Sequence, residues 1–436
     1  MDEDLDLKEL NQEKKYTEIC TFWDNRKNMD PVPELSEWDY VYCMNALYKE
    51  KRYNDCLQLY KEFHTTYKES ALLNSKMGWS LYHVHLKNHD FKKGNNGQYI
   101  KQVNFILAHC EQEAYSPLTK VIFDAVKAIL SGALGNPPNY VLANQYLDCL
   151  DPQKLSFSER TYQTPQGRTV KGASDREKWF NDKTKVLYSL KEYQKCIDYC
   201  DQALLHVFLR RNFHNNSDIW LQQKKISSLI ALDDLATAKT GITKLLRKPH
   251  LHWSIYELAF TIAEKEKNVE EALQYAGRCA LADSSHDMRV TFYANLAIFL
   301  HQQGWEEMAS LHRQLVDAIR REKGWKKYKW PADWQVEETS LKSTEIIKKL
   351  KPFWQEQSDK AKVFLIGTVK VLLGNGQSGF IKAIDGKDYY FNLRDTGKYS
   401  SQIQEGVRVK FTVEEHFDKK KNKMSLAAVD IRISEE

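Results

Sequence analysis

The chain has 436 residues, of which 42% are hydrophobic and 28% are charged, and its formal net charge is +5. This composition predicts a globular protein rather than a disordered one. Because so long a chain exceeds one ordinary core, we expect several domains or a stacked array. The small excess of positive charge does not by itself indicate a nucleic-acid-binding protein.

No targeting or metal-binding signal is apparent in the sequence. The N-terminal MDEDLDLKEL is acidic and lacks the apolar segment of a secretory signal. No apolar run approaches the roughly 18–20 residues of a membrane span, so we expect a cytoplasmic protein. The eight cysteines include no C-x-x-C pair, and Cys196 and Cys200, four residues apart, have no further ligands at suitable spacing. Buried thiols in a reducing compartment are therefore the favoured interpretation.

Five segments share one pattern: an apolar helix, a short polar turn, and a small residue that opens a second helix. They start at Arg52, Glu192, Asp234, Asn268 and Gly304. In the last four, the equivalent positions are 196, 238, 272 and 308, which are 42, 34 and 36 residues apart. The last match is imperfect, because Met308 is large and the small residue is its neighbour Ala309.

This pattern resembles the tetratricopeptide repeat, a unit of about 34 residues that forms two antiparallel helices. The resemblance covers about residues 35–318, with gaps, and the family's Trp, Gly and Pro positions are mostly absent. A small residue suits the place where the two helices cross closely. The resemblance implies that the hairpins stack into a superhelix whose concave groove holds a peptide or a protein partner.

Two polar stretches, residues 87–98 and 152–178, interrupt the array. The second is unusually long for a structureless loop inside an array, and such loops are often functional or mobile. A solvated loop is the favoured interpretation, and contact with nucleic acid or a partner is the alternative. The basic residues of this stretch are Lys154, Arg160, Arg168, Lys171, Arg176 and Lys178.

Residues 319–334, IRREKGWKKYKWPADW, interleave basic and aromatic side chains. Such a pattern can grip a nucleic-acid backbone and stack bases. The aromatic side chains can instead cover the exposed apolar end of a repeat array, and we favour this capping interpretation. Residues 336–351 are typical of a helix that Pro352 ends, and we expect Phe353 and Trp354 to anchor the segment before the last domain.

The C-terminal residues change to short strands with alternating polarity. Strands are predicted over residues 362–373, 378–384, 387–393, 407–415 and 424–433, with hairpin turns at Asn375-Gly376 and Asp385-Gly386. Five strands in so short a segment fit a small closed barrel of the OB type. The predicted fold class is therefore mainly α: an array of antiparallel helix hairpins followed by a five-stranded β-barrel.

The barrel sequence resembles a cold-shock domain over about a sixth of the chain. The matching motifs are Gly367-Thr368-Val369-Lys370, Gly379-Phe380-Ile381, Asp385-Gly386, Asp388-Tyr389-Tyr390-Phe391-Asn392 and Gly406-x-x-Val409-x-Phe411. The family binds single-stranded RNA or DNA by stacking bases on aromatic side chains of its second and third strands. The chain departs from the family at Val371-Leu372, Ser378 and Asn392, which implies fewer stacking positions and weaker binding.

Strand alternation predicts which of these side chains face outward. Phe380 and Lys382 share the outward face of one strand, and Tyr390 and Asn392 share that of the next. Tyr389 and Phe391 then point into the barrel. We further expect Lys370 and Arg394 to reach phosphates, which completes a predicted nucleic-acid site of Lys370, Phe380, Lys382, Tyr390, Asn392 and Arg394.

No motif indicates an enzyme or a cofactor. The stretch from Gly374 to Gly379 matches G-x-G-x-x-G, but it opens a strand rather than a helix, so a hairpin turn is the favoured interpretation. His85 and His89 could share a helix face, but no third metal ligand is evident. The sequence leaves open an active site whose residues are far apart in the chain and meet only in the folded structure.

The sequence therefore predicts a non-catalytic adaptor with three segments: a repeat array (1–318), a basic and aromatic capping helix with linker (319–360), and a barrel (361–436). The array would dock a protein partner while the barrel binds single-stranded RNA or DNA, in a setting such as bacterial RNA handling or anti-phage defence. The alternative is a pure protein scaffold whose barrel serves assembly.

Overall fold

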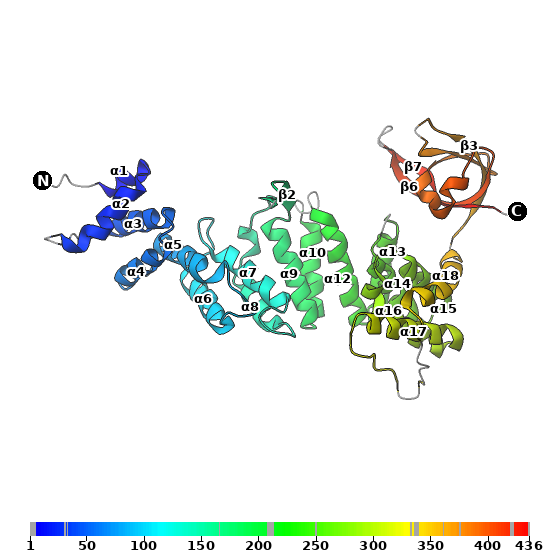
Figure 1. Cartoon of the computed structure of the whole chain (residues 1–436), viewed down its shortest axis with the longest axis horizontal. Helices are drawn as coiled ribbons and strands as arrows, with labels where there is room; N and C mark the ends of the chain where they lie inside the picture. The colour runs from blue at the N-terminus through cyan, green and yellow to red at the C-terminus, as the bar shows by residue number, and fades with distance from the viewer. Residues whose placement is uncertain are drawn as a thin grey trace. The chain divides into compact units, whose positions relative to one another are not determined.

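The computed structural model describes residues 6–29, 32, 34–164, 166–206, 213–248, 251–331, 334, 340–360, 362–374, 376–418 and 423–434 (Figure 1). The described chain is mainly helical and ends in a closed five-stranded barrel, which confirms the predicted fold class. The chain forms two compact units, Met1–Gly241 and Ile242–Glu436, called the first and second unit below. No helix in the described ranges is both long and apolar enough to cross a membrane. The three-segment division remains a prediction.

The helices follow one another as pairs along both units. The first unit holds α1 (Leu7–Gln12), α2 (Tyr16–Asn25), α3 (Glu37–Lys49), α4 (Tyr53–Phe63), α5 (Ala71–Leu81), α6 (Asn96–His109), α7 (Leu118–Leu130), α8 (Tyr140–Asp148), α9 (Asp175–Ser189), α10 (Tyr193–Leu205) and α12 (Ser217–Ala231). Helix α13 (Leu235–Leu246) spans the boundary. The second unit continues with α14 (Trp253–Lys265), α15 (Val269–Leu281), α16 (Val290–Gln302), α17 (Glu306–Glu322) and α18 (Ser343–Asp359).

Six of these helix pairs are joined by the same turn. The second residue after the first helix has left-handed backbone, with φ between 58° and 78°, at Lys14, Lys51, Lys191, Asp233, Lys267 and Gly304. The next residue then donates its N–H to a carbonyl five residues earlier, as Arg52 does to Leu47 and Asn268 to Ala263. This bond satisfies a carbonyl that the helix end would otherwise leave unpaired.

The small residues of the repeated pattern lie inside the helical array. The side chains of Cys56, Cys196, Ala238, Ala272 and Ala309 are all completely buried. Where two helices pack closely, a larger side chain would force them apart. The structure is therefore a helical, repeat-like array, and the sequence pattern correctly located its turns.

The stretch 152–178 is not structureless, so that expectation was wrong. Residues Arg160–Gln163 (β1) and Thr169–Gly172 (β2) form an antiparallel hairpin. The turn is closed by the Thr164 N–H donating to the Arg168 carbonyl at 2.8 Å, and Gly167 supplies a φ of 76°. Pro165 lies outside the described residues.

Pro352 does not end a helix, which corrects a second expectation. Helix α18 begins at Ser343 and continues through Pro352 to Asp359, and residues 336–339 of the predicted helix lie outside the described ones. Tertiary packing holds the helix together beyond the proline, because Trp354 is only 1% exposed. Gly277 of α15 permits this packing, since a Cβ there would lie 2.4 Å from the Trp354 carbonyl oxygen.

The barrel consists of β3 (Leu365–Leu372), β4 (Ser378–Ala383), β5 (Asp388–Asn392), β6 (Arg408–Asp418) and β7 (Lys423–Ile433). The strand order is β3-β4-β5-β7-β6, β6 closes onto β3, and only the β5–β7 pair is parallel. Each predicted strand is present, with ends that differ by up to three residues. The barrel has its own apolar core, which includes Val369, Ile381, Tyr389, Phe391 and Phe411.

Candidate nucleic-acid interface

Two aromatic side chains form a pair on the outside of the barrel. Phe380 of β4 and Tyr390 of β5 lie directly opposite each other in the strand register. Their ring centroids are 5.8 Å apart with an interplanar angle of 71°, which is an edge-to-face contact. Both side chains are only half-buried, whereas the neighbouring Tyr389 and Phe391 point into the core. The alternation predicted for these strands is therefore confirmed.

The local backbone explains why β4 can carry this pair. Gly379 lies between the pair and the core, and a Cβ at this position would lie 2.4 Å from the Val371 carbonyl and 2.7 Å from the Phe391 ring. The strands can therefore approach closely only because residue 379 is glycine. The Phe391 ring fills the space that a side chain would take.

Two of the predicted site residues lie beside the aromatic pair. Lys382 occupies the next outward position of β4, is exposed, and has no ion-pair partner in the described ranges. Asn392 occupies the next outward position of β5 and is half-buried. Its side-chain oxygen accepts the Arg394 N–H at 3.1 Å, so this oxygen caps the following turn. The amide nitrogen of Asn392 and the second lone pair of its oxygen can still contact a ligand.

The other two predicted cations have acidic neighbours. The Lys370 ammonium lies 2.5 Å from a carboxylate oxygen of Asp388, and Lys370 falls in a register irregularity of β3. The Arg394 Nε atom lies 3.7 Å from a carboxylate oxygen of Asp395. Surface ion pairs of this kind contribute about 0–1 kcal/mol, so a phosphate could displace either carboxylate. Both cations are nevertheless weaker candidates than Lys382.

Arg408 was not predicted to belong to this site. An open cavity of about 390 Å³ on the barrel surface is lined by Thr368, Lys382 and Arg408 together with Ile366, Gly367, Ala383 and Ile384. Arg408 lies on β6 and reaches this cavity because β6 pairs with β3. The signal that could have located it is the closure of the barrel, which no local pattern predicts.

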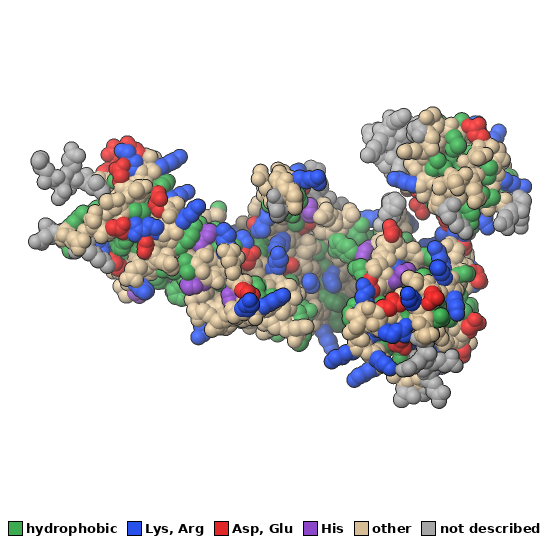
Figure 2. All heavy atoms as spheres, in the orientation of Figure 1, with side chains coloured by type: hydrophobic (Ala, Val, Ile, Leu, Met, Phe, Trp, Pro, Cys, Tyr) green, Lys and Arg blue, Asp and Glu red, His purple; other side chains and the backbone are tan. Residues whose placement is uncertain are grey.

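The surface charge is mixed. In the view of Figure 2, Lys and Arg side chains are spread over the helices and the barrel and alternate with Asp and Glu. This distribution fits the net charge of only +5. Attraction of a polyanion must then depend on local groups of unpaired cations rather than on the overall charge.

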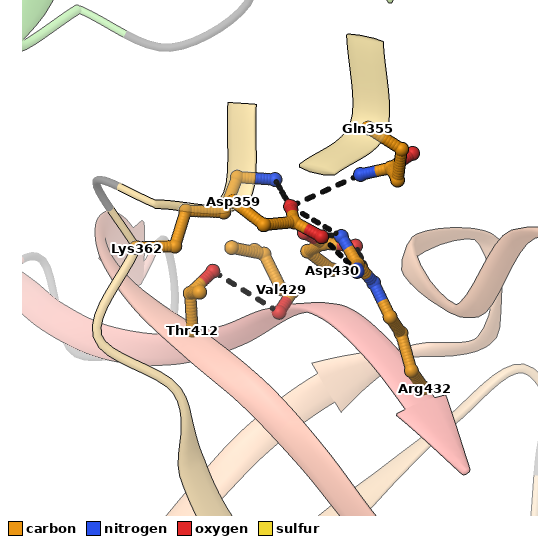
Figure 3. Close-up of polar contacts among 7 residues, drawn as sticks. All are labelled: Gln355, Asp359, Lys362, Thr412, Val429, Asp430 and Arg432. Carbon is orange, nitrogen blue, oxygen red and sulfur yellow. Dashed lines mark hydrogen bonds and ion pairs between the residues drawn. The ribbon is translucent and has the colours of Figure 1, made fainter. Parts of the chain in front are cut away.

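An ion-pair network connects the end of α18 to the barrel (Figure 3). The Arg432 guanidinium of β7 makes two contacts to the Asp359 carboxylate, one of them at 2.9 Å, and a further contact to Asp430 at 2.7 Å. Lys362 pairs with Asp430 at 2.5 Å, and Gln355 donates to Asp359 at 3.0 Å. Burial alone would raise the pKa of Asp359, but the Arg432 hydrogen bond and charge hold that pKa below its usual value.

In the basic and aromatic segment 319–334, three aromatic side chains pack against the second unit's helices, while residues 321–327, 329 and 331 are exposed. Tyr328 and Trp330 pack on the apolar core that α14 to α18 form, and the Trp330 indole lies 3.2 Å from both carboxylate oxygens of Asp317. Trp334 is 8% exposed, with the Arg313 guanidinium 4.6 Å from its ring centroid. Trp325 is 45% exposed, whereas Tyr328 and Trp330 are half-buried. This arrangement favours the capping interpretation.

No group of three or more His, Cys, Asp or Glu side chains is placed to hold a metal ion within the residues that the structure describes. Seven of the cysteines are buried and Cys149 is exposed. His89 is engaged with Asn96, with 3.0 Å between its Nε2 atom and the amide oxygen.

No protein-family model matches the chain, and no curated protein matches it. Function must therefore be inferred from the residues themselves.

Proposed function

We propose that this protein is a non-catalytic adaptor whose barrel binds single-stranded RNA or DNA while its helical array docks a protein partner. The observation that carries the proposal is the half-buried Phe380–Tyr390 pair on the outside of the barrel, with the exposed Lys382 beside it. Aromatic side chains on the second and third strands of an OB-type barrel are the usual platform for stacked bases. We interpret the barrel as cold-shock-like on these residues.

The expected affinity of the barrel is modest. Stacking contributes about 1–3 kcal/mol per base, and the positions where the cold-shock family has further aromatic side chains hold Val371, Leu372 and Ser378. Ser378 is 2% exposed, so it offers no surface to a base. Lys370 and Arg394 must exchange a carboxylate for a phosphate before they contribute. Tight binding would then require a longer contact surface.

The proposed role of the array follows from its repeated hairpins. The recurring left-handed turn and the buried small residues support a tetratricopeptide-like architecture. Stacked hairpins of this type present extended surfaces that hold peptides or proteins. A cytoplasmic adaptor in bacterial RNA handling or anti-phage defence is the setting that we propose for this combination.

The test is fluorescence anisotropy of the full chain with single-stranded RNA, single-stranded DNA and duplex, at low and high salt. The key variant is Phe380→Ala/Tyr390→Ala, and the matched control is Leu426→Ala, which truncates a 51% exposed side chain of β7. Loss of one stacked base predicts binding about 5- to 150-fold weaker. The control should bind like the unsubstituted protein.

Each outcome has a defined meaning. Salt-sensitive binding to single strands that the double variant loses would support the proposal. Binding that the double variant retains would remove the barrel face as the site. Absence of binding would leave the alternative, a protein scaffold in which the barrel serves assembly. The Asp359–Arg432 contact shows that the barrel surface already packs against one helix of the same chain.

A further inference from the structure

A row of exposed polar and basic side chains crosses three strands of the barrel. In the strand register, Thr368 of β3 lies opposite Lys382 of β4 on one side and opposite Arg408 of β6 on the other. All three residues are exposed. Adjacent strands are about 4.8 Å apart, so the backbones that carry the two cations are separated by roughly 10 Å. The three residues also line one open cavity.

The close approach of β3 and β4 at this row depends on Gly367. A Cβ at residue 367 would lie 2.6 Å from the Lys382 carbonyl oxygen and 2.7 Å from an Ile381 methyl group. Any other residue would push the two strands apart. The glycine therefore holds Thr368 and Lys382 side by side and keeps the row continuous.

The cations of the row differ from the other basic residues near the aromatic pair. Neither Lys382 nor Arg408 makes an ion pair among the residues that the structure describes, although Asp388 lies opposite Lys382 in the strand register, whereas Lys370 and Arg394 each make one. Unpaired cations on either side of a hydroxyl group are suited to successive phosphate groups, because the hydroxyl can donate to phosphate oxygens between them. A phosphate would therefore bind more favourably at this row than beside Lys370 or Arg394, where it must first displace a carboxylate.

The row is continuous with the stacking surface. Phe380 and Lys382 are successive outward positions of β4, about 7 Å apart along the strand. Ile384, which is 73% exposed, borders the same cavity and offers apolar surface to a sugar or base. A nucleic acid stacked on Phe380 and Tyr390 can therefore extend from β4 across β3 to β6.

We propose that Lys382, Thr368 and Arg408 form a phosphate-binding track that guides single-stranded nucleic acid away from the Phe380–Tyr390 pair and over β3 to β6. This inference rests on the proposed single-strand binding of the barrel. It adds Arg408 and Thr368 to the interface and gives the bound strand a direction across the barrel. It also supplies the longer contact surface that the few stacking positions require.

The test compares the full chain and its Arg408→Gln variant on oligouridylates of about 4 and about 16 nucleotides, the two ends of the site sizes of one OB fold. Each phosphate contact on a single strand contributes about 0.7 to the slope of log affinity against log salt. Arg408→Gln should lower the slope by about 0.7 on the longer oligomer and leave the shorter one unchanged. Arg408→Lys, which keeps the charge, should retain the slope.

The control is Lys349→Gln, which removes one exposed charge from α18 in the same unit. If Arg408→Gln behaves like this control on both oligomers while Phe380→Ala/Tyr390→Ala abolishes binding, the track is refuted and the proposed function stands. An equal loss on both oligomers would place Arg408 in the stacking site and would also refute the track. If the unsubstituted protein shows no salt-sensitive binding to these oligomers or to single-stranded DNA of the same lengths, both proposals fail.

Discussion

His312 should make the second unit unstable in acid. This side chain is completely buried on α17. Its Nδ1 atom lies 2.7 Å from the Met308 carbonyl oxygen, and its Nε2 atom accepts the Trp354 indole N–H at 2.9 Å. Both contacts are satisfied together by the neutral ring that carries its proton on Nδ1. Burial lowers the pKa of His312 from 6.5 to about 4.

The sign and size of the effect follow from this shift. Above pH 6.5 the ring is neutral in both the folded and the unfolded chain, so its stabilising contacts are fully present. As the pH falls below this value, the unfolded chain binds a proton that the folded chain refuses until about pH 4. A pKa difference of one pH unit between the folded and unfolded chain corresponds to 1.36 kcal/mol. The lowered pKa of His312 therefore removes about 3 kcal/mol of unfolding free energy by pH 4.

The measurement is urea unfolding of the full chain and of His312→Gln, followed by tryptophan fluorescence between about pH 7 and about pH 4. Near neutral pH the variant should be less stable by about 1–3 kcal/mol, because the Trp354 N–H loses its partner. This deficit should shrink by about 3 kcal/mol toward pH 4, since only the unsubstituted protein carries the titrating ring. The exposed His64→Gln serves as control and should show no such convergence.

Other groups titrate in the same pH range, but their effect cancels when the unsubstituted protein is compared with His312→Gln. His286, with a pKa lowered to about 4 chiefly by burial, has the same sign as His312. Burial raises the pKa of Glu257 to about 7, so the stability that its neutral form contributes is lost as the pH rises through that value. Both groups are present in the protein and in the variant. A constant stability difference across the range would refute a buried neutral role for His312.

Three further changes test the packing. Lys267→Gly should raise the unfolding free energy, measured by urea unfolding, by about 0.5–1 kcal/mol. The left-handed backbone at φ 58° costs a non-glycine residue about 1–2 kcal/mol, and glycine avoids this cost but makes the unfolded chain more flexible, which offsets part of the benefit. Gly277→Ala should cost more than about 2 kcal/mol, since its Cβ would lie 2.4 Å from the Trp354 carbonyl; an unchanged midpoint would contradict the α15–α18 packing. Asp359→Asn should increase amide hydrogen exchange where α18 meets the barrel. Added salt should have the same effect on the unsubstituted protein, because it screens the ion pair. Equal exchange in the variant and the unsubstituted protein would show that the Asp359–Arg432 pair does not hold this contact.

The turns of the array show how far a local pattern reaches. The small buried residues and the polar turns were located from the sequence, because close helix crossing leaves a mark at fixed positions. The left-handed backbone at Lys51, Lys191 and Asp233 was not, since these residue types carry no left-handed signal comparable to glycine. The hairpin β1–β2 was missed for a different reason: its Pro-Gln-Gly turn was visible, but its flanking strands are short and polar.

Pro352 illustrates a conflict between local and tertiary preferences. Proline removes one backbone donor and usually ends a helix. In α18 two of the residues beyond it, Trp354 and Gln357, are each only 1% exposed. Their packing against α15 and α17 offsets the lost hydrogen bond, and no local pattern contains this information.

In the barrel, the sequence by itself determined the strands, the inward position of Tyr389 and Phe391, and the outward pair Phe380 and Tyr390, because alternation along a strand is a local property with a period of two residues. The tertiary structure alone decided which cations meet carboxylates and which remain unpaired, and it brought Arg408 beside Thr368 and Lys382. It also joined Asp359 to Arg432 across 73 residues. The physical reason is that strand order and barrel closure bring distant segments into contact, and such contacts leave no mark on the spacing of neighbouring residues.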